Sequence, residues 1–347
     1  MYNDILRRTQ NSTPVEMLEK AFSERSGYSE IIAVSSLYAA YILAFSQLKE
    51  GDELLCSPMS DLALYQALKQ QKLHPNYLEL KLDGTLESRF IERTTTSHTK
   101  VLVVSHHHGL HTEMTAFQEL AQKEQLLLIE DASQAFHLTQ KSSADLVLFS
   151  IEALISPSTA QGAFIATDNP EWARQLRQLR EGGYVTKKLW NYDLLSTLPN
   201  TKLSTLIADF CYQALLTDLQ NSKRMQEIQN LYIEGLSSLK LLQLPTAEQL
   251  MVHYNFPIFL APALFCPKED IFQDLLTEGV AVSVGNKPIY KTTAFLDEST
   301  FLFGAEEVYK AQVLLPVQPE ISDETVYTII EKVNSVLEKY AYRGCSF

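Results

Sequence analysis

Three short apolar runs lie close together between residues 126 and 167, and they constrain the fold more than any other feature. The first covers residues 126–129 and ends in the acidic pair Glu130-Asp131, and the others cover 146–150 and 162–167. Short apolar runs with polar flanks are typical of strands buried inside a sheet. In open α/β sheets, ligands bind at the carboxyl ends of such strands. We therefore expect Glu130 and Asp131 at a ligand-binding edge.

Strand-like and helix-like segments alternate along most of the chain, which indicates βαβ units and a largely parallel sheet. Further strands are expected at 31–36, 53–57, 77–82 and 100–105, with helices at 37–48, 60–71, 113–125 and 171–180 and long helical periodicity at 203–239. After the prolines of residues 243–263, the pattern predicts a smaller α+β domain, with segments at 254–260, 271–278, 280–284, 313–316 and 324–340. We expect a large domain over 1–235 and a small one over 236–347.

Composition excludes several classes of protein. The 347 residues are 46% apolar, enough for a sizeable core, and the net charge is −13. Because Lys and Arg form no stripe, we expect neither nucleic acid nor membrane as a partner. No apolar run reaches the roughly 20 residues that span a bilayer. The four scattered cysteines and the polar N-terminus predict a reduced, cytoplasmic protein.

Several motifs together resemble the DegT/StrS family of sugar aminotransferases, which use pyridoxal phosphate (PLP). The family pattern E-D-A-x-Q-A is matched at 130–135, and its F-S-F-H-P-x-K-x-x-T-x-G segment at 149–162. The sequences L-R-E-G-G at 179–183, N-T-K-L-S at 200–204 and S-V-G-N-K-P at 283–288 resemble further family segments. The resemblance implies the fold type I PLP-transferase fold: a mostly parallel seven-stranded sheet flanked by helices, plus a smaller C-terminal α+β domain.

The resemblance implies that four cofactor-binding positions are retained. Asp131 matches the carboxylate beside the pyridine nitrogen, and Gln134 the residue at the ring oxygen. Ser150 matches a phosphate-binding serine. Asn200 matches an asparagine that reaches the phosphate of the partner subunit, which implies a homodimer. From local sequence alone, a helix N-cap after a strand is the favoured interpretation of Asp131.

Other cofactor positions are changed. Ile155 stands where the family has its Schiff-base lysine, so no catalytic residue is assigned. Leu37 and Tyr38 replace a phosphate-binding Gly-Thr, where glycine lets the backbone approach the phosphate. Asp61 replaces the aromatic residue that stacks on the ring. Gly285 and Tyr290 stand where the family usually has histidines.

A shift in alignment does not restore the lysine, because none occurs between Lys141 and Lys187. A related branch of the family uses histidine there with pyridoxamine phosphate (PMP), but no histidine occurs between His137 and His253. The substrate-side candidates are Lys187, Lys202, Gly285, Asn286 and Lys287. Each lysine is interpreted as a solvated surface residue or as a contact to a sugar-nucleotide phosphate.

The sequence His106-His107-His108 suggests a metal site, because closely spaced imidazoles bind zinc or nickel. Neighbouring residues on a strand point to opposite faces, however, so three consecutive histidines do not easily share one ion. The family resemblance instead places them in a turn after a strand. We predict no metal.

Two functions remain open. The first is a dimeric, non-catalytic relative of the sugar aminotransferases that binds a nucleotide-sugar-like ligand or a partner protein, such as an active paralogue, in surface-glycan biosynthesis. The alternative is an enzyme that binds PLP or PMP without a covalent bond and acts on a keto-sugar nucleotide. A purely structural protein is a third reading.

Overall fold

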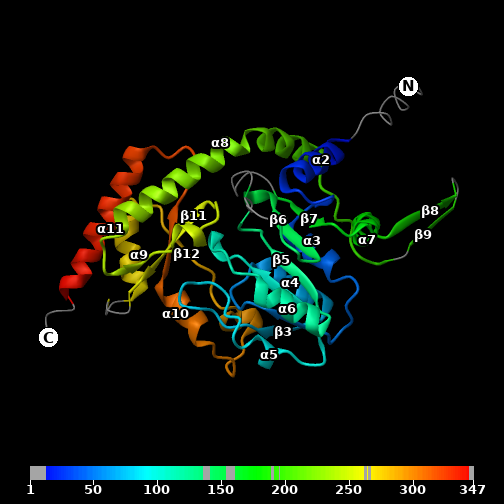
Figure 1. Ribbon diagram of the computed structural model, residues 1–347, viewed down its shortest axis with the longest axis horizontal. Coiled ribbons are helices and arrows are strands. Elements are labelled where there is room, and N and C mark those ends of the chain that lie inside the picture. Colours follow the sequence, from blue (N-terminus) through cyan, green and yellow to red (C-terminus); the bar gives the residue numbers. More distant parts are fainter. Residues whose placement is uncertain are drawn as a thin grey trace.

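The computed structural model describes residues 13–135, 141–153, 161–188, 191–194, 196–261, 264 and 267–343, without the side chains of 153, 185–188, 192, 217–219 and 342–343. It has a large seven-stranded sheet and a smaller four-stranded sheet, joined by one long helix that crosses the molecule (Figure 1). Ile155 lies outside the described residues.

The large sheet has the strand order β1-β7-β6-β5-β4-β2-β3, and β7 alone runs antiparallel to its neighbours. Its parallel pairs are β2·β3, β2·β4, β4·β5 and β5·β6. This confirms the mostly parallel seven-stranded sheet. The strands are β1 (Glu30–Val34), β2 (Glu53–Cys56), β3 (His74–Tyr77), β4 (Thr99–Ser105), β5 (Leu127–Asp131), β6 (Leu146–Ser150) and β7 (Ala163–Thr167).

Helices cover both faces of this sheet. One apolar cluster packs α3, α4 and α7 against alternate strand residues such as Ile32 and Ile129, and two further clusters pack α2, α8, α5 and α6 against the opposite face. The strands are therefore buried on both sides, as expected for parallel sheets. The helices are α2 (Pro14–Ser26), α3 (Leu37–Ala44), α4 (Leu62–Gln71), α5 (Ile91–Thr94), α6 (Thr115–Glu124), α7 (Pro170–Arg180) and α8 (Thr205–Leu236).

The smaller sheet is antiparallel, with the order β10-β11-β13-β12. Its core also contains side chains from the C-terminal half of α8, including Met225 and Tyr232, together with α9 and α11. Its elements are β10 (Leu242–Gln243), β11 (Asn255–Leu260), α9 (Lys268–Thr277), β12 (Ser283–Val284), α10 (Phe303–Ala311), β13 (Gln312–Pro316) and α11 (Asp323–Arg343). The boundary at 235/236 stays a prediction, but α8 contributes to both cores.

Two local predictions need correction. The strand expected at 77–82 is wrong, because the edge strand β3 occupies His74–Tyr77 and the leucines that follow it lie in a loop. The sequence patterns also missed a hairpin of β8 (Tyr184–Lys188) and β9 (Asn191–Leu194), which projects from the body at the right of Figure 1.

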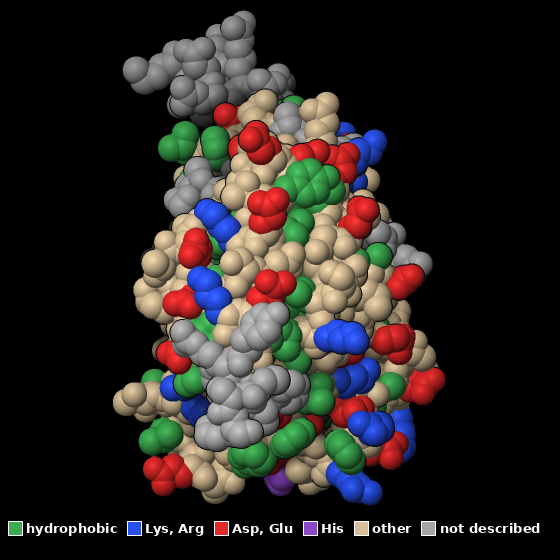
Figure 2. Space-filling view, turned by 90° about the vertical axis from the view of Figure 1, so that its left-hand side faces the viewer, with side chains coloured by type: hydrophobic (Ala, Val, Ile, Leu, Met, Phe, Trp, Pro, Cys, Tyr) green, Lys and Arg blue, Asp and Glu red, His purple; other side chains and the backbone are tan. Residues whose placement is uncertain are grey.

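Acidic and basic side chains are interspersed on the face that includes α11 (Figure 2). None of the helices in the described part of the chain is both long and apolar enough to cross a membrane.

Candidate functional site

The carboxyl ends of the parallel strands bring several polar residues to one edge of the large sheet. Ser57 follows β2, while Ser105, Asp131 and Ser150 end β4, β5 and β6. All four are buried. The polar edge predicted from the sequence is therefore present. Glu130 and Asp131 lie at this edge and form hydrogen bonds with different residues.

Asp131 is enclosed by donors from the protein itself. Its Oδ2 accepts a hydrogen bond of 2.7 Å from the Tyr41 hydroxyl and one of 3.2 Å from Ser105 Oγ. Its Oδ1 accepts from the backbone N–H of Ser133 at 3.0 Å. Only 2% of Asp131 and none of Tyr41 is exposed. Burial, and then the Asp131 charge, raise the pKa of Tyr41 well above its usual range, so Tyr41 stays a donor.

The hydrogen-bond network continues from Asp131 into the loop after β2. Ser105 Oγ lies 2.9 Å from Ser60 Oγ, and the Ser60 N–H donates to the Tyr65 hydroxyl at 2.8 Å. Tyr65 in turn donates to the Ser57 carbonyl at 2.7 Å. Two buried tyrosines thus fix the surroundings of Asp131, and sequence motifs pointed to neither.

Asp61 adds a second carboxylate beside this network. It caps α4, accepting from the Ala63 N–H at 2.8 Å, as expected for aspartate at a helix start. Burial and the Asp131 charge raise the pKa of Asp61, although its bond to Ala63 acts in the opposite direction. Burial and the Asp61 charge likewise raise the pKa of Glu152. The Asp131 charge thus acts on Asp61, and the Asp61 charge acts on Glu152.

The predicted phosphate-side residues lie at the same edge. Leu37 and Tyr38 begin α3, are half-buried and pack on the main core. Ser36 caps this helix, its side chain accepting from the Ala39 N–H at 3.1 Å. Ser150 Oγ accepts from the Glu152 N–H at 3.2 Å. The oxygen of each serine hydroxyl thus accepts a hydrogen bond from neighbouring backbone.

Gln134 forms a hydrogen bond with the turn that contains His106, His107 and His108. Gln134 Oε1 accepts from the His108 N–H at 2.6 Å. His106 Nε2 lies 2.9 Å from Glu130 Oε1, and its Nδ1 accepts from the Thr112 N–H at 3.1 Å. His107 Nε2 lies 2.8 Å from Ser57 Oγ. The rings of His106 and His107 thus have separate partners, and within the described chain no group of three potential ligands could hold a metal ion.

The substrate-side candidates are spread out. Asn200 is exposed, its Oδ1 accepting from the Lys202 N–H at 3.0 Å, and Lys202 forms an ion pair with Glu181. Asn286 donates from its amide to the Met59 carbonyl at 2.9 Å and thereby holds the loop that leads to Asp61. Lys287 is exposed, and Gly285 packs closely against Gln312. The side chain of Lys187 lies outside the described residues.

The edge around Asp131 fits a phosphorylated pyridine poorly. A negatively charged phosphate bound at this edge would be repelled by the carboxylates of Asp61 and Glu152 once they are ionised. The carboxylate expected to face the ring nitrogen is buried and accepts three hydrogen bonds from the protein.

Solved structures define the class of fold. *Helicobacter pylori* PseC, an aminotransferase involved in pseudoaminic acid biosynthesis, superposes with a TM-score of 0.88 at 21% identity over 98% of this chain and 96% of its own. The PLP form of the putative sugar aminotransferase Spr1654 from *Streptococcus pneumoniae* gives 0.86 at 19% identity over 95% and 92%. The fold is that of the PLP-dependent aminotransferases.

Sequence comparison then identifies the family. A family model for the DegT/DnrJ/EryC1/StrS aminotransferases matches residues 4–334. The UDP-4-amino-4,6-dideoxy-N-acetyl-beta-L-altrosamine transaminase of *Campylobacter jejuni* is 26% identical over 92% of this chain and 90% of its own length. This chain belongs to the DegT/DnrJ/EryC1/StrS aminotransferase family.

Proposed function

We propose that this chain is a non-catalytic member of the family, which keeps the fold and a dimeric assembly and binds a nucleotide-sugar-like ligand or a partner protein in amino-sugar biosynthesis. The single observation that carries the proposal is the enclosure of Asp131. Tyr41, Ser105 and Ser133 supply donors to the carboxylate that the family pattern assigns to the pyridine nitrogen.

Two further features support the loss of transamination. The family pattern places Ile155 at the Schiff-base lysine, and an isoleucine side chain has no amine to attach a cofactor. Asp61 stands at the ring-stacking position, where it adds negative charge in place of an aromatic face. Together these changes remove covalent attachment and oppose phosphate binding.

The kind of ligand is inferred from the relatives. The *C. jejuni* transaminase is named for a UDP-linked amino sugar, and PseC for the biosynthesis of pseudoaminic acid. We therefore expect a nucleotide sugar or an active paralogue as the partner. Mass spectrometry of small molecules released from the purified protein tests the first option, with a nucleotide sugar at near-stoichiometric amount as the expected result.

The alternative is an enzyme that holds PLP or PMP without a covalent bond and acts on a keto-sugar nucleotide. Its support is that Asp131 and Ser150 still end neighbouring strands at the predicted edge. Cofactor titrations separate the two proposals, because a ligand that binds only the folded state raises the melting temperature with concentration. We expect no saturable shift with PLP or PMP, and a saturable shift with either supports the enzyme.

The Ile155→Lys variant restores the lysine and so tests whether the rest of the cofactor site at the Asp131 edge still binds PLP. We expect excess PLP to add no more visible absorbance to this variant than to the wild type, whose surface lysines control for nonspecific attachment. A second variant, Ile155→Lys with Asp61→Phe, replaces the carboxylate by a ring. If Ile155→Lys alone turns yellow stoichiometrically, the pocket is intact and the non-catalytic proposal loses its main support.

A further inference from the structure

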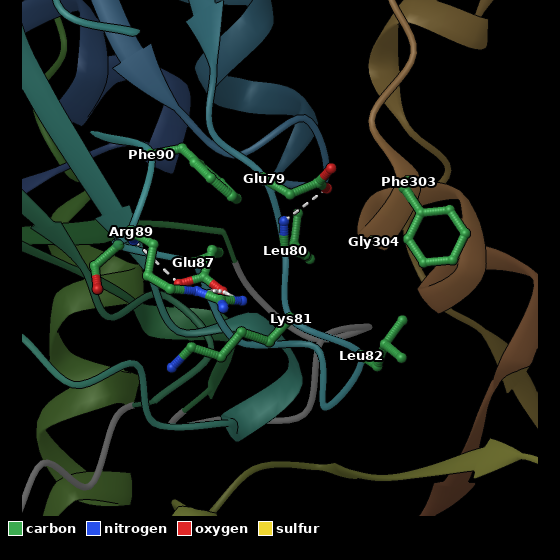
Figure 3. A pocket seen from close by; sticks show the side chains of 10 residues that line it. Glu79, Leu80, Lys81, Leu82, Glu87, Arg89, Phe90, Phe303 and Gly304 are labelled. Atoms are coloured by element: carbon green, nitrogen blue, oxygen red, sulfur yellow. Dashed lines mark hydrogen bonds and ion pairs between the residues drawn. The ribbon is translucent and has the colours of Figure 1, made fainter. Parts of the chain in front are cut away.

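A pocket of about 700 Å³ lies outside the Asp131 edge, between the loop of residues 79–90 and the start of α10. We call it the 79–90 pocket. In Figure 3, Phe90 and Arg89 lie on one side, Phe303 and Gly304 on the opposite side, and Lys81 and Leu82 along the loop between them. None of the residues that contact Asp131 lines it.

The walls of the pocket expose large apolar groups. Leu82 is 53% exposed, Phe90 44% and Phe303 58%. Exposed apolar side chains that surround a concave site are typical of binding sites rather than of ordinary surface. Phenyl rings on both sides of the pocket suit an aromatic ligand, because aromatic rings pack favourably on one another.

The acidic groups of the lining already have partners. Glu79 Oε1 accepts from the backbone N–H of Leu80 at 2.9 Å and of Ala305 at 3.1 Å, so it ties α10 to the loop. Glu87 Oε2 accepts from Arg89 Nε at 2.8 Å, and this bond chiefly lowers the pKa of Glu87. Glu87 is thus ionised near neutral pH, and the positive charge of Arg89 balances its negative charge.

The lining carries two carboxylates, Glu79 and Glu87, and two cations, Lys81 and Arg89. Within the described part of the chain, no ion pair involves Lys81, which lines the pocket and is exposed. The guanidinium groups of Arg89 and Arg93 lie 5.8 and 5.9 Å from the centre of the Phe90 ring. Because Arg89 already pairs with Glu87, Lys81 is the lining cation that can contact an anionic group of a ligand.

We propose that the 79–90 pocket is a second binding site, for a planar aromatic ring that carries an anionic group. The ring lies against Phe90 and Phe303, and the anion faces Lys81. Nucleoside phosphates and aromatic carboxylates share this chemistry. The proposal is independent of the function proposed for the Asp131 edge.

The test is a fluorescence titration with 8-anilinonaphthalene-1-sulfonate, an aromatic anion. We expect saturable binding of one dye per chain, and about tenfold weaker binding by Phe303→Ala, because the variant loses a ring contact together with its apolar area. The matched control is Phe301→Ala, since Phe301 is 69% exposed on the same segment but does not line the pocket. Equal affinities for the two variants would overturn the proposal.

Charge reversal gives an independent readout. Lys81→Glu should weaken dye binding and flatten its dependence on salt, whereas Lys49→Glu, on an exposed loop elsewhere, should change neither. Competition then distinguishes the sources. Displacement of the dye by UMP points to a nucleoside phosphate, and displacement by 2-naphthoate alone points to a carboxylate. Displacement by neither compound overturns the assigned ligand class. Because all these variants are at exposed residues, matching melting temperatures establish that the fold is unchanged.

Discussion

At the scale of single residues, the sequence predicts Asp131 but not what surrounds it. A strand that ends in acids predicts a carboxylate at the sheet edge, and β5 places it there. Tyr41 is 90 residues away in the chain, inside an apolar helix whose pattern only indicates burial. Contacts between distant segments depend on how the helices pack on the sheet, and a local sequence motif does not predict that packing.

The Tyr41→Phe variant tests the enclosure of Asp131. Removing the hydroxyl leaves a buried carboxylate with one donor fewer, so we expect the free energy of unfolding to fall by about 1–3 kcal/mol. Urea unfolding followed by tryptophan fluorescence measures the change. Tyr327→Phe, at an exposed position, is the control and should stay within about 0.5 kcal/mol of the wild type. Equal stability of both variants would mean that Tyr41 contributes little to holding Asp131.

The buried histidines make stability depend on pH. Burial lowers the pKa of His107 to about 3, assisted by its neighbours His108 and His106, and burial lowers that of His108 to about 4. Both groups titrate near 6.5 in the unfolded chain, which therefore binds more protons below that pH. Their contribution to stability is complete above pH 6.5 and falls toward pH 4, by about 1.4 kcal/mol per pH unit for each histidine.

The His108→Asn variant should remove one of these two contributions. Asparagine tolerates the left-handed backbone of His108, at φ 49°, and any constant packing loss does not alter the slope against pH. We expect a slope shallower by about 1.4 kcal/mol per pH unit between pH 6 and 4.5, measured by urea unfolding. His98→Asn, at an exposed site, should keep the wild-type slope. An unchanged slope in His108→Asn would show that His108 is protonated in the folded protein.

At the scale of elements, buried strands are predicted well and edge elements poorly. The apolar run 146–150 coincides with β6. The wrong prediction at 77–82 arose because Leu78, Leu80 and Leu82 alternate like a strand, whereas the actual edge strand β3 contains Pro75 and Asn76, which weaken any strand pattern. Pro75 is tolerated because β3 pairs only with β2. The strands of the β8–β9 hairpin, YVTKK and NYDL, mix apolar and polar residues and form no continuous apolar run.

The start of α10 depends on Gly304. A methyl group there would run into the backbone carbonyl of Leu80, which has little freedom to move. We expect Gly304→Ala to lower the free energy of unfolding by about 1–3 kcal/mol through overpacking. Chemical denaturation measures it, with Lys310→Ala on the exposed side of the same helix as the control. A variant as stable as the control would mean that α10 can shift away from the loop at no cost.

At the scale of the whole molecule, the β8–β9 hairpin suggests how two copies meet. An isolated two-stranded hairpin is marginally stable in water, yet this one projects from the body with Leu194 58% exposed (Figure 1). We predict a dimer in which the hairpin contacts the second copy. Leu194→Asp should weaken dimerisation by about tenfold or more in sedimentation experiments, whereas Leu276→Asp on α9 should not. A monomeric wild type would contradict the prediction.

The long helix α8 has a consequence for how the protein melts. Its N-terminal residues Ala208 and Cys211 belong to the core of the large sheet, and Ile228 and Tyr232 belong to the core of the small one. If one core unfolds, α8 loses part of its packing, and the other core, which also contains side chains of α8, is weakened. Heating should therefore produce one calorimetric endotherm with matching calorimetric and van't Hoff enthalpies. Limited proteolysis of the folded protein should likewise release neither half as a stable fragment.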